Sequence, residues 1–366
     1  MRQETLCLRH RAGDRSARPL KISPVIGTVR FSIELSKPYP PGVDVGILVV
    51  DGVADLGLGA LLGTFGTANA LRKELRNPPP PWNIRTVSQG SSVRSGSGNL
   101  VPTTPLGEIP ARLDTLAVAA VDILEPEPLV ELVTDAEHTR VLEHIRGARA
   151  EGVHLAAACT ATFFLAESGV LDDSPATTSW WLGACFRGRY PRVQLDESCI
   201  VCHGDGITTA GASLSHMDMA LSLIYRTSPE LAERAMRYLA VGPRASQTPY
   251  AIPEVMARGS SLIAGYERWV RDHLSEQFLI ATAARELGVT ERSLQRATRA
   301  ALGMSPKDFA DDIRLDRATH LLRSGGLTVG AVAREVGYVN ASALRALARR
   351  RRGQSLAEIR AHRLPW

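Results

Sequence analysis

The sequence predicts an α/β domain built on a parallel sheet, followed by an all-α domain that contains two helix-turn-helix motifs. Between residues 43 and 240, hydrophobic strand patterns alternate with helix patterns, which is typical of a parallel sheet covered by helices on both faces. From about residue 261 the strand patterns stop, and amphipathic helix patterns that end at glycine follow one another.

Charge divides the chain in the same way. Residues 1–42 carry a net charge of +5 (8 basic, 3 acidic), residues 43–260 carry −7 (17 basic, 24 acidic), and residues 261–366 carry +7 (18 basic, 11 acidic). This asymmetry favours nucleic acid as a partner of the C-terminal segment only. Hydrophobic residues make up 44% of the chain, as in ordinary soluble proteins, and no apolar run is long enough to span a bilayer.

The first segment, residues 1–42, is rich in Arg, Ser and Pro and shows no sustained hydrophobic period. We expect it to be a flexible extension. It lacks the apolar core of a secretion signal. The chain has 5 cysteines, and without an export signal we expect these thiols to stay reduced in the cytoplasm.

Strand and helix patterns follow one another through the α/β segment. We expect strands at 43–50, 83–88, 113–121 and 153–158. We expect helices at 58–75, 137–149, 160–167, 213–225 and 229–239. The Pro, Ser and Gly content of the residues that follow is typical of a linker, which we place at 241–260.

Cys159 is expected at the carboxyl end of the fourth strand, on an abrupt junction with the next helix. Ligands of parallel sheets bind at such ends. A thiol held there lies near the positive end of the helix, which would lower its pKa. We therefore predict a ligand-binding site formed by Cys159 and Thr160, with Asp55 and Ser179 contributed by other segments.

Several motifs further along the chain complete a family pattern: Gly169–Asp172, Ala176–Trp180, Tyr190–Val193 and Thr209–Gly211. With them, residues 43–226 resemble the ThiJ/PfpI family, which is similar to class I glutamine amidotransferases. The resemblance implies a flavodoxin-like sheet. It also implies that the cysteine at the strand–helix junction can act as a nucleophile together with a histidine and an acid.

The sequence departs from that chemistry at three places. Gly57 stands at the family's usual acid position, Ser179 stands where many relatives have histidine, and Ala119–Ala120 replaces the glycine pair of an oxyanion-binding turn. A thiol without a positioned base is poorly equipped for acyl transfer. We therefore expect no catalytic residue and a domain that binds a small molecule or mediates dimerisation. The alternative is an amidase or related hydrolase that depends on Cys159.

Cys199–His203 has the C-x-x-C-H spacing of covalent haem attachment. The pattern is that of a strand running into the Gly204–Gly206 turn of a hairpin, so its two cysteines would point to opposite faces. We therefore expect no haem, no metal site and no other cofactor.

Two matching helix-turn-helix patterns organise the C-terminal segment. In the first, an apolar helix pattern at 279–287 ends at Gly288, and a second helix pattern follows at 290–296. In the second, the pattern at 328–336 ends at Gly337, and another helix pattern follows. The later helix of each pair has the form that lies in a DNA major groove.

A predicted helix at 306–323 connects the two motifs. Ser305 is a suitable N-cap, Pro306 suits the first helical position, and Gly325–Gly326 ends the helix. A helix of that length spans about 27 Å, roughly the spacer needed to set two recognition helices one DNA turn apart. An amphipathic helix at 262–270 opens the domain.

Residues 262–360 resemble the AraC/XylS class of bacterial transcription regulators through Gly303–Pro306, the paired turns and Arg334–Tyr338. Joined to the ThiJ/PfpI-like segment, the whole chain resembles the GlxA-type transcription regulators. The resemblance implies that Arg292, Gln295 and Arg296 face bases or nearby phosphates. Arginine with guanine and glutamine with adenine are also pairings that groove chemistry favours.

We predict DNA contacts by polar side chains of both recognition helices. These are Arg292, Gln295, Arg296, Arg299, Ser342, Arg345, Arg349 and Arg350. The second half departs from the family pattern, because Ala346 replaces a usual arginine, and Ala348 and Arg352 replace usual core aromatics. Arg345 and the run Arg349–Arg352 remain basic, so we expect this half to hold phosphates more than to read bases.

Together these features predict a cytoplasmic, sequence-specific transcription regulator that binds double-stranded promoter DNA. We expect a homodimer, by family likeness, with an α/β sensor domain at 43–240 and a DNA-binding domain at 261–366. An unidentified small-molecule effector would shift the population of domain arrangements and so change DNA binding. An architectural DNA binder without a ligand is a third hypothesis.

Overall fold

The structure is a computed structural model that describes residues 42–109, 113–242, 244, 246–258 and 260–361. The expected extension at 1–42 lies outside the described residues, except for Gly42. No helix in the described part of the chain is both long enough and apolar enough to cross a membrane.

One seven-stranded sheet lies at the centre of the α/β part. Its strands are β1 (Val43–Leu48), β2 (Trp82–Ser88), β5 (Thr104–Pro105), β6 (Thr115–Val118), β7 (His154–Ala158), β10 (Val201–Gly204) and β11 (Ile207–Ala210). They lie in the order β10-β11-β7-β6-β1-β2-β5. β10 pairs antiparallel with β11, and every other pairing in this sheet is parallel.

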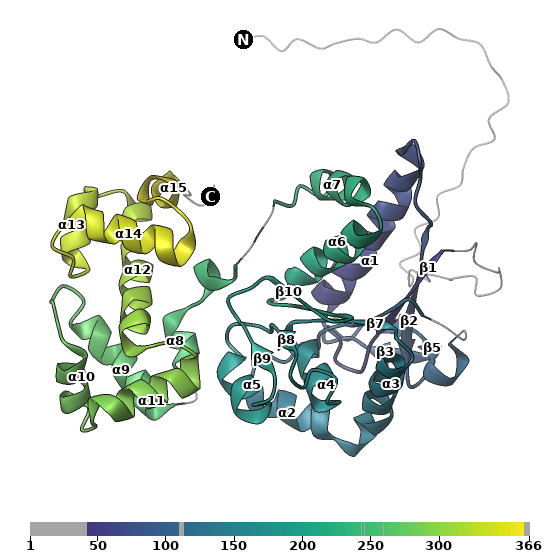
Figure 1. The fold of residues 1–366 in the computed structure, drawn as a ribbon, viewed down its shortest axis with the longest axis horizontal. Coiled ribbons are helices and arrows are strands. Elements are labelled where there is room, and N and C mark those ends of the chain that lie inside the picture. Colours follow the sequence, from purple (N-terminus) through teal and green to yellow (C-terminus); the bar gives the residue numbers. More distant parts are fainter. Residues whose placement is uncertain (1–41, 110–112, 243, 245, 259, 362–366) are drawn as a thin grey trace, which may run out of the picture. The chain divides into compact units, whose positions relative to one another are not determined.

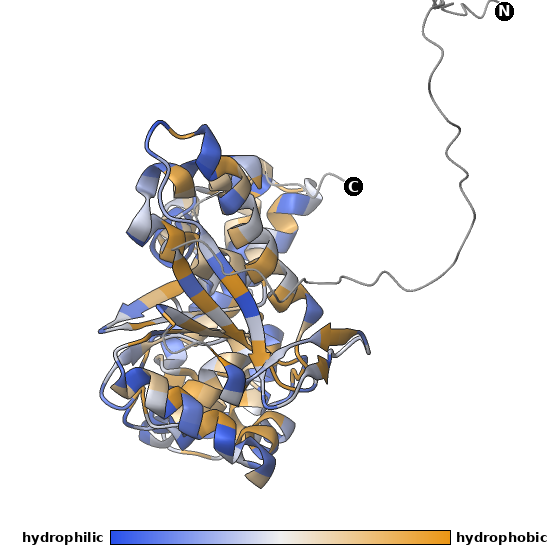
Figure 2. Ribbon diagram, turned by 90° about the vertical axis from the view of Figure 1, so that its right-hand side faces the viewer, coloured by the Kyte–Doolittle hydropathy of each residue, from blue (hydrophilic) through white to orange (hydrophobic). Residues whose placement is uncertain are grey.

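Helices cover both faces of this sheet (Figure 1). One face carries α1 (Asp55–Leu71), α6 (Ser215–Thr227) and α7 (Pro229–Tyr238). The other carries α2 (Pro126–Thr134), α3 (Thr139–Ala150), α4 (Thr162–Glu167) and α5 (Gly183–Arg189). In Figure 2 the strands show orange segments, interrupted by white and blue ones, and they run between helices that are striped orange and blue.

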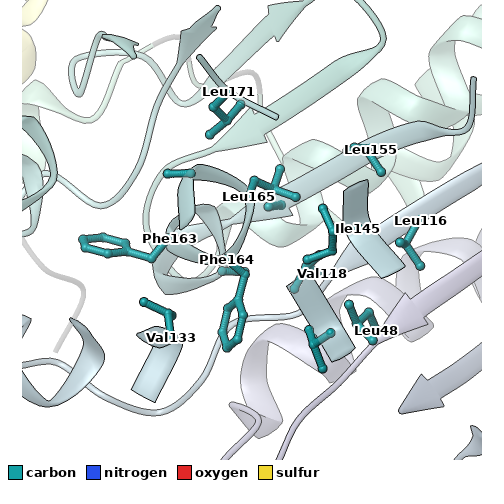
Figure 3. Packing of buried hydrophobic residues seen from close by; sticks show 14 of the residues in the cluster. Leu48, Leu116, Val118, Val133, Ile145, Leu155, Phe163, Phe164, Leu165 and Leu171 are labelled. Carbon is teal, nitrogen blue, oxygen red and sulfur yellow. The ribbon is translucent and has the colours of Figure 1, made fainter. Parts of the chain in front are cut away.

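Strand β7 shows how alternation builds two cores. Leu155 and Ala157 face one hydrophobic cluster, and Ala156 and Ala158 face the other. This follows from the two-residue period of a strand, which sends successive side chains to opposite faces. Figure 3 shows the first cluster, where Phe164 of α4 packs beside strand residues. Burying each large side chain of this kind contributes about 1.5–3 kcal/mol.

The predicted fold class is confirmed, and most predicted elements are present. The four expected strands correspond to β1, β2, β6 and β7, with ends that differ by a few residues. The five expected helices correspond to α1, α3, α4, α6 and α7. Hydrophobic periodicity missed α2 and α5, and it missed the strand pairs β3 (Ser92–Arg94) with β4 (Leu100–Pro102) and β8 (Pro175–Ala176) with β9 (Gln194–Leu195). Strands of two or three residues, such as these, are too short to establish a period.

The C-terminal part is helical throughout and contains both predicted helix-turn-helix motifs. Its helices are α9 (Ser261–Asp272), α10 (Ile280–Glu286), α11 (Glu291–Leu302), α12 (Pro306–Ser324), α13 (Val329–Glu335), α14 (Ala341–Arg352) and α15 (Leu356–Ala361). The first motif is α10 with α11, and the second is α13 with α14.

Helix α12 connects the two motifs and contributes to the core of each. Its Phe309 and Ile313 belong to the cluster around α9 to α11, whereas Leu315 and Leu322 belong to the cluster around α13 to α15. The predicted N-cap is confirmed, because the Ser305 hydroxyl accepts a hydrogen bond from the Asp308 amide at 3.1 Å. A single continuous helix thus runs through both halves.

The segment expected to be a linker has structure of its own. It contains a 3-10 turn, η5 (Thr248–Tyr250), and a short helix, α8 (Pro253–Met256). Gln247 is only 1% exposed, which its Pro- and Ser-rich surroundings did not predict.

Candidate nucleic-acid interface and candidate ligand site

The recognition helix of the first motif presents one free polar face. Thr290 caps α11 by accepting a hydrogen bond from the Ser293 amide at 3.1 Å, after a turn in which Gly288 adopts φ 71°. Leu294 and Thr298 point into the core and are fully buried. Helical periodicity then turns the opposite side of α11 outward.

The predicted contact residues of α11 occupy this outward face at i, i+3, i+4 and i+7. All four are exposed: Arg292, Gln295, Arg296 and Arg299. Within the described residues none of these three arginines forms an ion pair, and the Gln295 amide donates only to the exposed Glu291 at 3.2 Å. The four side chains are therefore placed together and free to bind a ligand.

The second motif begins with a turn that only glycine can form. Gly337 has φ 78°, and a Cβ there would meet the carbonyl oxygens of Leu274 at 2.6 Å and Glu276 at 2.8 Å. Asn340 then caps α14 by accepting from the amides of Ser342 and Ala343 at 3.0 and 3.1 Å. This close approach sets the second motif against the end of α9.

The predicted contact residues of α14 divide into two groups. Ser342, Arg345 and Arg349 are exposed, and so is Ala346, where the family usually has arginine. The Arg350 side chain is 59% exposed, but it lies 3.3 Å from the Asp311 carboxylate of α12. The second face thus offers fewer free cations than the first.

The run Arg349–Arg352 is not a uniform phosphate-binding surface, which corrects the expectation. Arg351 forms an ion pair with Asp312 of α12, and Arg352 donates to the Thr319 hydroxyl at 2.6 Å. Since these two residues follow buried Leu344 and Ala348 by seven and four positions, the helix turns them toward α12. Burial lowers the pKa of Arg352, whose side chain is 8% exposed.

A small cluster on α12 holds the two motifs together. The Tyr338 hydroxyl of the second turn donates to Asp311 at 2.8 Å. The Arg314 guanidinium lies 4.6 Å from the centre of the Phe278 ring and 5.6 Å from that of Tyr338, so it bridges both motifs. The relative orientation of α11 and α14 is thereby fixed by side chains as well as by α12 itself.

The candidate ligand site in the α/β part is centred on Cys159, directly after β7. Cys159 begins the 3-10 turn η4 (Cys159–Ala161) with φ 60°, a strained conformation for a residue other than glycine. Its side chain is 4% exposed, and its Sγ accepts a hydrogen bond from the Ser179 hydroxyl at 2.9 Å. The predicted neighbours Cys159, Thr160 and Ser179 are therefore brought together.

The expected lowering of the Cys159 pKa is wrong. Burial raises the pKa of this thiol, and the hydrogen bonds from Ser179 and the Thr160 amide offset that rise only in part. The short turn after β7 gives little dipole, whereas removal from water disfavours the thiolate strongly. The thiol is therefore protonated at neutral pH and is a poor nucleophile.

The backbone amides that follow β6 are both occupied from inside the protein. The Ala120 amide lies 3.3 Å from Nε2 of His216, and the Val121 amide donates to the Thr160 hydroxyl at 2.9 Å. In the resembled family this turn helps to bind an oxyanion. Here neither amide is free to do so, because each already has a buried acceptor.

His216 is the residue of this site that sequence reasoning missed. It is fully buried, and its Nδ1 lies 2.7 Å from the Ser213 carbonyl oxygen, so that Nδ1 carries the proton and Nε2 accepts. Burial lowers its pKa to about 4. A Cβ at Gly57 would lie 2.9 Å from this ring, so the imidazole fills the space of a Gly57 side chain. A single histidine in the predicted α6 pattern gave no signal of this role.

Asp55 forms its hydrogen bonds with a segment other than the one around the cysteine. Its carboxylate accepts from the Ser97 amide at 3.1 Å and the Asn99 side-chain amide at 2.9 Å, next to the β3–β4 pair. Hydrogen bonds, of which the one from Asn99 has the largest effect, lower the pKa of the Asp55 carboxyl to about 2. Within the described residues it makes no hydrogen bond to Cys159, Thr160 or Ser179, so its predicted ligand-binding role has no geometric support.

The C-x-x-C-H motif lies at the predicted hairpin, with His203 in β10. The Cys199 thiol donates to the Asp196 carboxylate at 3.0 Å, and burial raises its pKa to about 11. Across the described ranges, no group of three or more His, Cys, Asp or Glu side chains is arranged to hold a metal ion.

Comparison with known proteins adds the following likenesses. A family model described as a helix-turn-helix domain matches residues 283–362. The HTH-type transcriptional regulator CdhR of Pseudomonas aeruginosa is 26% identical over 303 residues, covering 82% of this chain and 86% of that protein. The HTH-type transcriptional regulator GlxA of Rhizobium meliloti is 27% identical over 255 residues, covering 68% and 75%. A solved structure of an AraC family transcriptional regulator from Pseudomonas putida is 20% identical and covers 54% of this chain and 99% of its own, with a TM-score of 0.45.

Proposed function

We propose that the chain is a helix-turn-helix transcription regulator that joins a ThiJ/PfpI-like domain to an AraC-type domain, and that it binds promoter DNA sequence-specifically in the cytoplasm. The observation that carries the proposal is the face of α11, where Arg292, Gln295, Arg296 and Arg299 are exposed together and form no ion pair with any residue that the structure describes. Base reading then falls mainly to α11, while Ser342, Arg345 and Arg349 of α14 hold the DNA backbone.

A gel-shift experiment with the region upstream of the chain's own gene tests this proposal. We expect a specific complex at moderate salt that unrelated competitor DNA does not remove, because base contacts add to the salt-dependent phosphate contacts. A complex that competitor DNA removes as efficiently as the upstream region does would contradict sequence-specific reading. It would support the architectural DNA binder instead.

The α/β part at 43–240 acts in this proposal as a non-catalytic sensor, connected through 241–260 to the DNA-binding part at 261–366. A protonated, buried Cys159 and two occupied amides leave no nucleophile and no oxyanion site, which argues against the hydrolase alternative. The same buried cluster of Cys159, Thr160 and Ser179 is a polar region at the carboxyl end of a parallel strand, where small molecules bind in such folds. A small-molecule effector is therefore proposed to bind there.

A homodimer completes the proposal, and α1 is the surface that fits a second copy. Between Leu56 and Leu71 the helix has no charged residue, yet Leu56 is 57% exposed and Leu62 is 40% exposed. Gly59 and Gly63 lie on the same open side, where an added Cβ would meet no atom within 4 Å. An uncharged apolar face with glycines at i and i+4 lets two identical helices approach closely about a two-fold axis.

Replacing Gly63 by arginine is expected to convert the dimer to a monomer, as measured by light scattering coupled to size-exclusion chromatography. A Cβ at Gly63 would meet no described atom within 4 Å, so the fold should remain while two arginines face each other across the axis. Gly147→Arg on α3 is the matched control, since this glycine is also open and helical but lies on the opposite side of the sheet. A Gly63→Arg protein that stays dimeric would exclude this face.

A further inference from the structure

Gln247 is inserted into the α/β part from the segment that leads to the helix-turn-helix motifs. Its side chain is 1% exposed, and its Nε2 lies 2.9 Å from the carbonyl oxygens of Thr178 and Cys199 and 3.0 Å from that of Glu197. Its own amide donates to the Ser198 carbonyl at 2.7 Å. The connecting segment is thus attached by this buried side-chain amide and a backbone bond, and in addition by Arg244, which forms an ion pair with Asp218 and donates to the Leu214 carbonyl at 3.3 Å.

The slot around Gln247 fits this side chain closely. A Cβ at Gly211 would lie 2.2–2.4 Å from the end of the glutamine, so any larger residue at Gly211 would displace it. The two amide protons of Gln247 are shared among three carbonyls, whereas its Oε1 has no hydrogen-bond partner among the described residues. The attachment therefore depends on the donor atoms of the amide, and a side chain of the same length without donors would not replace it.

The residues that hold Gln247 also hold Cys159. Thr178 offers its carbonyl to Gln247 while its hydroxyl donates to the Cys159 carbonyl at 2.8 Å. The next residue, Ser179, donates to the Cys159 thiol at 2.9 Å. Thr177, Thr178 and Ser179 are all 0% exposed, so the short segment that joins the two sites is packed on every side. A displacement at one end cannot be absorbed by solvent-filled space.

We propose that Gln247 is a positioning residue that couples the Cys159 site to the segment leading to the DNA-binding part. A molecule that enters beside Cys159 must move Ser179 or Thr178, and this weakens the bond from Gln247 to the Thr178 carbonyl. When this bond weakens, the connecting segment is released from the α/β part. When the bond is intact, the segment stays attached. This inference rests on the proposed sensor function of the α/β part, and it supplies the route by which that site regulates the rest of the chain.

Thermodynamic reciprocity allows the coupling to be tested without knowing the effector, because a change at Gln247 must also change the Cys159 site. In the full-length protein, Gln247→Met keeps the length and removes the donors. We expect the rate of Cys159 alkylation by iodoacetamide to rise about tenfold, as measured by mass spectrometry of the labelled peptide. The labelling rate of Cys185 should stay the same. Gln194→Met, at an exposed glutamine of the same part, is the matched control.

The converse experiment starts at the cysteine. Ser179→Ala removes the hydrogen bond to the thiol. We expect hydrogen exchange of the Gln247 backbone amide to become about tenfold faster. Ser222→Ala on α6, which removes another serine hydroxyl bond in the same part, should leave that exchange rate unchanged. Both experiments are independent of DNA and effector, so they can fail while DNA binding is observed, and the reverse also holds.

Two results would overturn the coupling. Equal acceleration of Cys159 and Cys185 labelling in Gln247→Met would mean general loosening of the fold. Unchanged Cys159 labelling in that variant, or unchanged exchange of the Gln247 amide in Ser179→Ala, would mean that the two sites are independent. Faster labelling of Cys159 but not of Cys185, together with faster exchange of the Gln247 backbone amide, would support the coupling.

Discussion

Replacing Arg296 by alanine is expected to weaken binding to the specific promoter site by on the order of 1–3 kcal/mol and to relax base preference at one position. The reason is its location in the middle of the free face of α11, where the side chain is exposed and forms no ion pair with any described residue. Binding of variant sites, each with one base pair changed, measures both effects. The loss of affinity should be large for sites with the preferred base pair at that position and small for sites with any other base pair there.

Arg351→Ala is the matched control for this experiment, because it removes an arginine of the other recognition helix that is paired with Asp312. We expect it to destabilise the contact between α14 and α12, by leaving a half-buried carboxylate unpaired, without altering base preference. If Arg296→Ala weakens all sequences equally and reduces the salt dependence, Arg296 contacts a phosphate. Base reading would then have to be assigned to Arg292 or Gln295.

Acid is expected to destabilise the α/β part well before its carboxylates titrate, because His216 is buried in the neutral form. Burial lowers its pKa from 6.5 to about 4, so between these values the unfolded chain binds a proton that the folded chain does not. Stability is therefore complete above pH 6.5 and falls as pH decreases toward 4. The shift corresponds to about 3 kcal/mol of unfolding free energy.

Urea unfolding at a series of pH values, followed by tryptophan fluorescence, measures this dependence. His216→Gln keeps an acceptor for the Ala120 amide and cannot titrate, so its unfolding free energy should fall less between pH 6.5 and 4. Burial also lowers the pKa of His154 to about 4. Because His154 is still present in the His216 variant, part of the dependence of unfolding free energy on pH remains. His320→Gln, at an exposed position, should keep the full slope. An equal slope in the His216 variant would show that its protonation is not coupled to folding.

Features that depend on a few neighbouring residues were predictable from the sequence. Gly288 and Gly337 mark the turns of the two motifs because only a residue without Cβ adopts their positive φ easily. The free face of α11 follows from its 3.6-residue period once Leu294 is assigned to the core. The position of Cys159 at a strand–helix junction likewise follows from the pattern on either side of it.

Features that depend on distant parts of the chain were decided only by the tertiary structure. His216 meets an amide 96 positions away, and Gln247 meets a carbonyl 69 positions away, so no local pattern reports either contact. The ion pair of Arg351 and the raised pKa of Cys159 depend on which groups pack nearby and how much water they exclude. The sequence by itself determined where most helices, the turns of the two motifs and the recognition faces lie, because these follow from local periodicity. Whether a polar group there is free, paired or removed from water was settled by packing between segments, because desolvation and long-range hydrogen bonds arise only in the folded chain.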